Sequence, residues 1–147
     1  PPYEGSNINA SAGGVTPRLA DIAGYYHAFG MQVCHNRPDH IVAELEFLAF
    51  TMLLESDARH ADDDGRSEIA AAATRSFLRD HIGTWVHPWA EQVMAQPDLE
   101  PWHAAARLAA DLVAYEAHVR NVVPIVAGAP AHDTATDDEE LACGFAS

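Results

Sequence analysis

The chain has 147 residues, of which 48% are hydrophobic, so it suits one domain with a buried core and not a disordered chain. Its 22 acidic residues outnumber 8 basic residues, all arginines, and the formal charge is −14. Such a surface repels nucleic acids and anionic membranes but attracts basic peptides. Cys34 and Cys143 form no CxxC pair, which excludes a disulfide framework and a zinc pattern and fits free thiols in a reducing cytoplasm.

The first half of the chain predicts an arm and two helices. Residues 1–14 are rich in Gly, Ser and Asn and are expected to form a loop or extended arm. Thr16-Pro17 starts a helix over 17–29 that Gly30 ends. A second helix is expected over 38–56, with Pro38 in its first position and Asp39 complementing its positive end. Its apolar stripe is Ile41, Leu45, Leu48 and Met52, with Asp39, Glu46 and Glu55 largely off that stripe.

The second half predicts three more helices and a tail. After a charged break at 57–66, one helix is expected over 67–86 and a short one over 88–97, beginning at Pro88. Asp98 is expected to cap the last helix, which runs up to Pro124. Its predicted core stripe is Trp102, Ala105, Leu108, Leu112, Tyr115 and Val119. The pattern predicts an all-α bundle over 1–126, followed by an acidic tail over 127–147.

Motifs for catalysis are missing from the sequence. It contains no G-x-S-x-G elbow, P-loop, G-x-G-x-x-G or HExxH pattern, so we expect no enzyme and no cofactor. His40 and Glu44 lie one helical turn apart and could form a metal-like pair. Two ligands do not close a metal site, so no metal is predicted. A small metal- or haem-binding helical protein that uses His40, Glu44 and His81 remains the rival hypothesis.

Three ordered segments carry a family resemblance. They are Tyr26-x-x-Phe29-Gly30, the string Pro38-Asp39-His40-Ile41 followed by Glu44-Leu45-x-Phe47-Leu48, and Phe77-x-x-x-His81-Ile82-x-x-Trp85. Together they resemble the TorD/DmsD family of NarJ-like chaperones, which mature bacterial molybdoenzymes; Leu48 stands where that family usually has Met. The resemblance covers roughly residues 1–121. Because Pro2-Tyr3-Glu4-Gly5 is similar to a segment that follows the N-terminal helices of that family, we expect the C-terminal two-thirds of a member.

The resemblance implies a TorD-type bundle and a cytoplasmic chaperone. It would bind the twin-arginine signal peptide and the apo-form of a molybdoenzyme catalytic subunit, and hold that subunit for molybdenum cofactor insertion before export. The residues that match the family's binding positions are Asp39, His40, Glu44, Tyr26, Arg37 and Pro38. Phe77 and Trp85 lie two turns apart on the predicted helix and are expected in the core. Absent N-terminal helices would leave apolar faces bare, which predicts that the chain is not a simple monomer and allows a homodimer, domain-swapped as in the family.

Overall fold

The computed structural model describes residues 1–8, 15–32 and 37–125, and these residues form an all-α bundle, which confirms the predicted fold class. Within them, the only extended pairing is an isolated bridge between Tyr3 and His40. Cys34, Cys143 and the acidic tail predicted over 127–147 lie outside the described residues. The helices are α1 (Glu4–Asn7), α2 (Val15–Ala28), α3 (Ile41–His60), α4 (Asp64–Asp80), α5 (Ile82–Met94), the 3-10 helix η1 (Pro97–Leu99) and α6 (Glu100–Val119).

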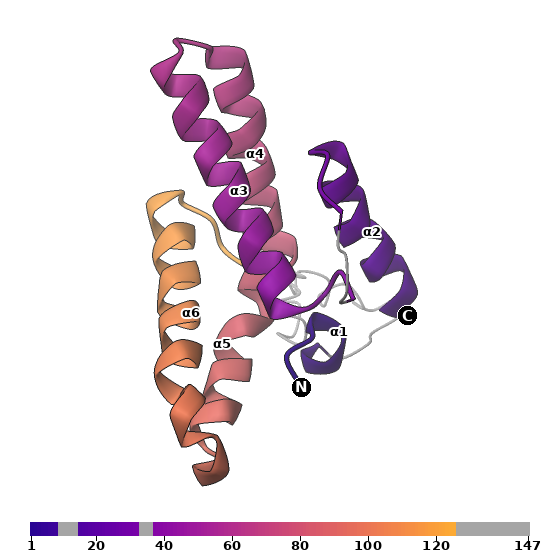
Figure 1. Ribbon diagram of the computed structural model, residues 1–147, viewed down its shortest axis with the longest axis vertical. Helices are drawn as coiled ribbons and strands as arrows, with labels where there is room; N and C mark the ends of the chain where they lie inside the picture. Colours follow the sequence, from indigo (N-terminus) through magenta and orange to yellow (C-terminus); the bar gives the residue numbers. More distant parts are fainter. Residues whose placement is uncertain (9–14, 33–36, 126–147) are drawn as a thin grey trace, which may run out of the picture.

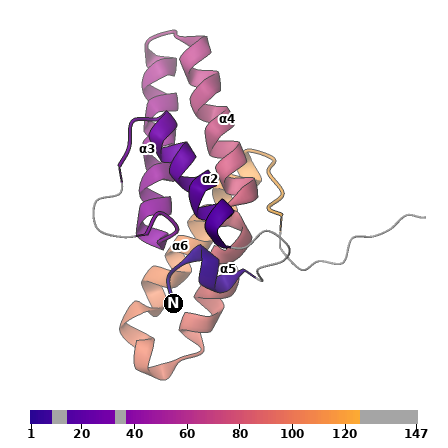
Figure 2. The same cartoon turned by 90° about the vertical axis from the view of Figure 1, so that its right-hand side faces the viewer.

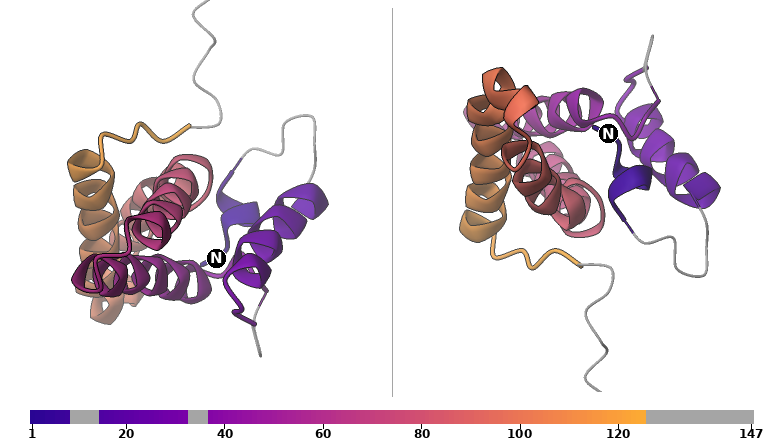
Figure 3. Two further views of the ribbon diagram at one scale, coloured as in Figure 1. Left: turned by 90° about the horizontal axis from the view of Figure 1, so that it is seen from above. Right: turned by 90° about the horizontal axis from the view of Figure 1, so that it is seen from below.

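The helices pack as two long pairs and a smaller unit. Helices α3 and α4 run side by side, and α5 and α6 form a second pair beyond them (Figure 1). Helix α2 lies across α3 and α4, with α1 near its lower end (Figure 2). Viewed along the long axis, α1 and α2 stand on the opposite side of the molecule from α6 (Figure 3). The beginning of α3 therefore lies between the α1–α2 unit and the α5–α6 pair.

An aromatic cluster joins α2, α3 and α4. The rings of Phe47 and Phe77 lie 4.7 Å apart between centroids, and Tyr26 packs on both. Phe77 and Trp85 are fully buried, which confirms their predicted core role. They do not share a helix, however, because α4 ends at Asp80 and Trp85 belongs to α5. Phe77 and Trp85, which were predicted to lie on one helix, are therefore on two helices that meet at a corner.

The corner between α4 and α5 explains why the expected helix over 67–86 is broken. His81 has φ −123° and ψ −105°, outside the helical region, and it caps both helices. A Cβ atom built on Gly83 would lie 2.1 Å from the carbonyl oxygen of Leu78, so only glycine permits this close approach. Pro88 does not begin a helix as predicted but lies inside α5. It removes one backbone hydrogen bond, and the buried Trp85 and Ala90 on either side hold the helix together.

Helix α3 begins three residues later than predicted. Its N-cap is His40, whose Nδ1 atom accepts a hydrogen bond from the Val42 N–H at 3.2 Å. Pro38 therefore precedes the helix and is not its first residue. Glu55, expected off the apolar face, is also buried: it pairs with Arg59 and, at 2.8 Å, with Arg120 beyond α6. The Glu55–Arg120 ion pair joins the C-terminal parts of α3 and α6.

Helix α6 is rotated relative to the sequence prediction. Its buried residues are Ala106, Ala110, Val113, Glu116 and Ala117. The predicted core stripe faces outward instead, with exposed fractions of 65% for Trp102, 68% for Leu108 and 61% for Tyr115. Small side chains allow α6 to approach α5 closely, whereas the larger residues would hold the two axes apart. The expected cap is also wrong, because α6 starts after η1 with no side-chain cap. Among the described helices, none is long and apolar enough to cross a membrane.

We predict opposite effects for two tryptophan substitutions. Trp85→Ala should lower the free energy of unfolding by about 3–5 kcal/mol, because it removes a fully buried ring. Trp102→Ala, at a 65% exposed position, should change it by less than about 0.5 kcal/mol. Urea unfolding followed by far-ultraviolet circular dichroism measures both. A Trp85→Ala variant with near-normal stability would contradict the core assignment.

Candidate functional site

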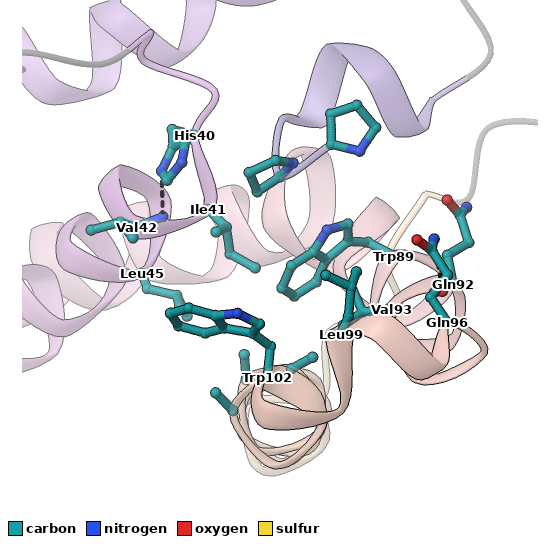
Figure 4. A pocket seen from close by; sticks show the side chains of 15 residues that line it. His40, Ile41, Val42, Leu45, Trp89, Gln92, Val93, Gln96, Leu99 and Trp102 are labelled. Atoms are coloured by element: carbon teal, nitrogen blue, oxygen red, sulfur yellow. Dashed lines mark hydrogen bonds between the residues drawn. The ribbon is translucent and has the colours of Figure 1, made fainter.

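An apolar groove lies between the beginning of α3 and the α5–α6 pair. Its volume is about 570 Å³, within the range of ligand-binding pockets. One wall comes from α3, the floor from α5, and the other wall from η1 and α6 (Figure 4). The lining residues are Pro1, Pro2, His40, Ile41, Val42, Leu45, Trp89, Gln92, Val93, Gln96, Leu99, Trp102, Ala105, Ala106 and Ala109.

The chemistry of this groove suits an apolar ligand segment. The indoles of Trp89 and Trp102 both extend into it from different helices (Figure 4). His40 is the only ionisable side chain among its lining residues, and Gln92 and Gln96 add amides at the α5 side. Asp98 and Glu100, which flank the lining residue Leu99 in sequence, are both exposed. The groove itself therefore offers a mainly apolar lining.

His40 is the predicted site residue that reaches this groove. Its backbone pairs with Tyr3, and its ring lies edge-on to the Tyr3 ring at 5.1 Å between centroids. Because Nδ1 caps α3, the imidazole is fixed in orientation at the mouth of the groove. Sequence reasoning selected His40 as a signal-peptide-binding residue, which stays a prediction, and it did not indicate the capping role.

Arg37 and Asp39 form an ion pair behind His40. Asp39 is 1% exposed, and its carboxylate accepts two hydrogen bonds from the Arg37 guanidinium, at 3.0 and 2.8 Å. It also accepts the Gly5 N–H at 3.1 Å. The Arg37 guanidinium lies over the Tyr3 ring at 5.1 Å from its centroid. Asp39 therefore links the segment before α3 to the Pro1–Asn7 segment.

Tyr26 and Pro38 connect α2 to the same corner. The buried Tyr26 hydroxyl donates to the carbonyl oxygen of Pro38 at 2.7 Å. Burial, followed by the nearby charges of Glu44 and Glu4, raises the pKa of this hydroxyl above its usual range. Tyr26 therefore stays protonated and acts as a donor.

Glu44 is buried in the bundle, one helical turn after His40. Its Oε2 atom accepts a hydrogen bond from Trp85 Nε1 at 3.1 Å. Burial, and next the negative charge of Glu4, raise the pKa of Glu44 well above that of an exposed glutamate. The predicted pairing of His40 with Glu44 on one side is not formed through their side chains, because Glu44 turns toward α5 and His40 toward Tyr3.

A polar cluster that sequence reasoning missed lies beside Glu44. Glu4 is fully buried and contacts Arg18 of α2 and, at 3.4 Å, Nδ1 of His81. The other imidazole nitrogen of His81 lies 3.1 Å from Asp21. Arg18 also donates to the Asp80 carbonyl and, at 3.3 Å, to Thr84 Oγ1. No signal in the sequence indicated that Glu4, a single acid in a Gly-rich arm, would be buried in this cluster. Only its place in the Pro2-Tyr3-Glu4-Gly5 segment pointed to it.

The rival metal hypothesis finds no assembled site in the part of the chain that the structure describes. No group of three or more His, Cys, Asp or Glu side chains there is placed to hold a metal ion. Its three proposed ligands point to different partners: His40 to Tyr3, Glu44 to Trp85, and His81 to Glu4 and Asp21.

Comparison with known proteins decides the family. The profile described as nitrate reductase delta subunit matches residues 1–91, which is more than half of the chain. The chain belongs to the nitrate reductase delta subunit family. This is the NarJ/TorD-like chaperone family that the motifs indicated, so the resemblance is confirmed. The match covers α1 to α4 and most of α5, whereas α6 lies beyond it.

One curated relative agrees with this family assignment. The chain is 36% identical over 89 residues to the selenate reductase assembly chaperone protein of Thauera selenatis. The matched part covers 57% of this chain and 43% of the relative, so the chain spans less than half the length of that protein. No solved structure gave a significant match. In this member of the delta subunit family, the groove residues of α3 and Trp89 lie within residues 1–91, which the family profile matches. Trp102 lies outside that range.

We predict that Asp39 contributes more to stability than its partner Arg37. Asp39→Ala should cost about 2–3 kcal/mol of stability, because it removes buried hydrogen bonds to a charged group. Arg37→Ala should cost less than Asp39→Ala, because the Arg37 side chain is 48% exposed and water can reach the carboxylate once the side chain is gone, while the Gly5 N–H still donates to it. Thermal unfolding of both variants, with the exposed Glu46→Ala as a control, tests this ranking. Equal losses for Asp39→Ala and Glu46→Ala would contradict it.

Proposed function

We propose that this chain is a maturation chaperone for a molybdoenzyme catalytic subunit. It binds the twin-arginine signal peptide and the apo-form of that subunit, and it holds the subunit for molybdenum cofactor insertion before export. The family assignment and the name of the selenate reductase relative support an assembly role. The observation that carries the binding hypothesis is the apolar groove that opens at His40, inside the family motif.

The groove and its surroundings fit the two parts of such a peptide. A signal peptide has a basic start followed by an apolar stretch, and an apolar helix can lie in a groove with its larger side chains buried. Trp89 and Trp102 supply rigid aromatic surface for the apolar stretch. Asp98 and Glu100 are exposed next to Leu99, where they can meet the arginines. The formal charge of −14 steers a basic peptide toward the protein from a distance.

The residues selected from the family motif divide into two groups in this proposal. His40 lines the groove and contacts the peptide, with Arg37 and Pro38 partly accessible beside it. Asp39, Glu44 and Tyr26 are buried and act by fixing the segment that carries His40. The proposed activity is binding in the cytoplasm and needs no reaction on a substrate, so we propose no enzymatic role. The proposed partners are the catalytic subunit and its signal peptide.

We predict that groove substitutions weaken peptide binding. The probe is a synthetic peptide with two consecutive arginines followed by an apolar stretch, measured by isothermal titration calorimetry. Trp102→Ala should raise Kd by about tenfold or more, because central tryptophans dominate such interfaces. His40→Asn should also weaken binding while asparagine keeps the helix cap.

Leu112→Ala is the matched control, because Leu112 is exposed on α6 but does not line the groove. It should bind like the wild type. Equal losses for Leu112→Ala and Trp102→Ala would place the peptide elsewhere on α6, and unchanged affinity for all variants would reject the groove as the binding site.

We predict that the acids beside Leu99 bind the basic part of the peptide. The double variant Asp98→Asn, Glu100→Gln should weaken binding and reduce its dependence on salt, because two charge contacts are lost. Replacing both arginines of the peptide by glutamine should abolish the difference between wild type and variant. Asp111→Asn, at an exposed position bearing only an Arg107 pair, is the control. A double variant with wild-type affinity and salt dependence would show that other acids meet the arginines.

A further inference from the structure

The outward side of α6 is apolar, although none of the described residues covers it. The buried residues of α6 lie on the side that packs on α5, and the opposite side is exposed at the margin of the molecule (Figure 3). A row of apolar residues runs along the middle of this exposed side and is called the outer stripe: Pro101, Leu108, Leu112, Tyr115 and Val119. A surface helix normally presents polar residues to water, and a helix that is apolar on both sides is typically buried on both.

The outer stripe forms one continuous apolar surface. Its large side chains follow one another at helical spacing, with exposed fractions of 68% for Leu108, 47% for Leu112, 61% for Tyr115 and 49% for Val119. On one flank it continues into Ala105 of the groove lining. Contiguous exposed apolar patches of this kind mark protein interaction sites.

A row of charged residues follows the other flank of the outer stripe. This charged edge consists of exposed residues only: Glu100, Arg107, Asp111 and His118. Arg107 and Asp111 stand equally far before and after Ala109, and they contact each other at 3.6 Å. Glu100 and His118 also stand equally far from Ala109. Each acid of the edge therefore has a basic side chain at the mirrored position.

We propose that α6 packs through its outer stripe against α6 of a second copy of this chain, antiparallel, with the two-fold axis at the level of Ala109. In a two-fold dimer of antiparallel helices, an edge meets the same edge of the partner helix in reversed order. Arg107 then faces the partner's Asp111, and Glu100 faces the partner's His118. The two outer stripes cover each other and leave water. The opposed helix dipoles add to the attraction.

The charged edge selects this register over the neighbouring ones. A two-fold axis at the level of Arg107 would bring the two Arg107 side chains of the dimer together. An axis at the level of Asp111 would bring the two Asp111 side chains together. Opposed like charges are unfavourable across an interface, so both alternatives are disfavoured. The level of Ala109, midway between Arg107 and Asp111, pairs every charge of the edge with an opposite one.

The net charge of the chain opposes association only from a distance. Two copies with a formal charge of −14 repel each other, but the Debye length at physiological salt is about 8 Å. Charges near the contact therefore dominate, and there the two acids of the edge meet Arg107 and His118 while the outer stripe carries no charge. An unrelated apolar segment would also cover the stripe but has no use for mirrored charges. The second copy is thus the occupant that the charged edge favours.

Sedimentation equilibrium of the ligand-free 147-residue chain at about 0.15 M salt tests the contact face. The wild type should show a concentration-dependent dimer. Leu108→Asp should raise the dimer Kd by about tenfold or more, because it places a charge in an apolar contact. Helical content by circular dichroism should stay unchanged, since Leu108 is exposed in the monomer. Leu53→Asp is the matched control, because Leu53 is a 64% exposed leucine on α3, and it should dimerise like the wild type.

Charge reversal with mixing tests the antiparallel register. Arg107→Glu and Asp111→Arg, each alone, place like charges opposite each other and should raise Kd by about tenfold. In an equimolar mixture of the two variants, the introduced glutamate of one chain faces the introduced arginine of the other, so association should return to about the wild-type strength. Loss of the Arg107–Asp111 contact within one chain cannot explain such a rescue, because each chain keeps its own like charges after mixing.

Three results would overturn the proposal. A wild-type Kd weaker than about 1 mM would show that the stripe is not a self-association surface. A dimer that survives Leu108→Asp with unchanged Kd would use another face. A mixture that associates no better than either charge variant alone would exclude the antiparallel register. Because no peptide is present, these results stand apart from the success or failure of signal-peptide binding.

Discussion

The buried contact of Glu4 with Arg18 and His81 is the interaction on which the rest of the structure depends. The three residues come from α1, from α2 and from the corner between α4 and α5, so one carboxylate joins segments far apart in the chain. A buried carboxylate is costly unless its partners satisfy it, and removing one partner of such a pair typically costs about 3–5 kcal/mol. With Glu4 in place, the Pro1–Asn7 segment meets Asp39 and fixes the start of α3. The position of His40 at the groove follows from this chain of contacts.

An ion pair holds α3 and α6 together at one end, and the groove lies between the beginning of α3 and α6. The Arg120 guanidinium contacts both Glu55 of α3 and Glu116 of α6, so the C-terminal parts of the two helices are held together. Toward the other end, Trp89 on α5 forms a floor that keeps Leu45 and Trp102 on separate walls. The small residues that face α5 bring α6 close to that floor while its large side chains remain free. The same rotation of α6 that made the predicted core stripe wrong therefore creates an apolar surface available for binding.

Local patterns in the sequence were sufficient to place the helices along the chain, but not to predict which face of a helix is buried. Pro17, Gly30 and the apolar spacing after Pro38 placed α2 and α3 nearly correctly, since capping and periodicity act over a few residues. Asp39 was predicted to complement a helix end, yet its partner Gly5 lies 34 residues away and leaves no local signal. The orientation of α6 depended on packing density, because an alanine face and a tryptophan–leucine face are both apolar and periodicity cannot rank them. His40 was predicted as a site residue because its motif is local, whereas the contacts of Glu4 with Arg18 and His81 form only in three dimensions.

Burial divides the acidic residues of this chain into two kinds with different consequences. Glu4, Asp39, Glu44 and Glu55 lie inside, where each meets a specific arginine or an indole N–H, and they determine which segments touch. Asp98 and Glu100 lie outside, where water screens them and they act mainly on the approach of a charged partner. The formal charge of −14 therefore does not measure attraction for a basic peptide directly, because several of the acids that contribute to it are buried. In the proposed function, the exposed Asp98 and Glu100 select for arginines and the apolar groove selects for an apolar stretch, so together they distinguish a peptide that is both basic and apolar from one that is only basic.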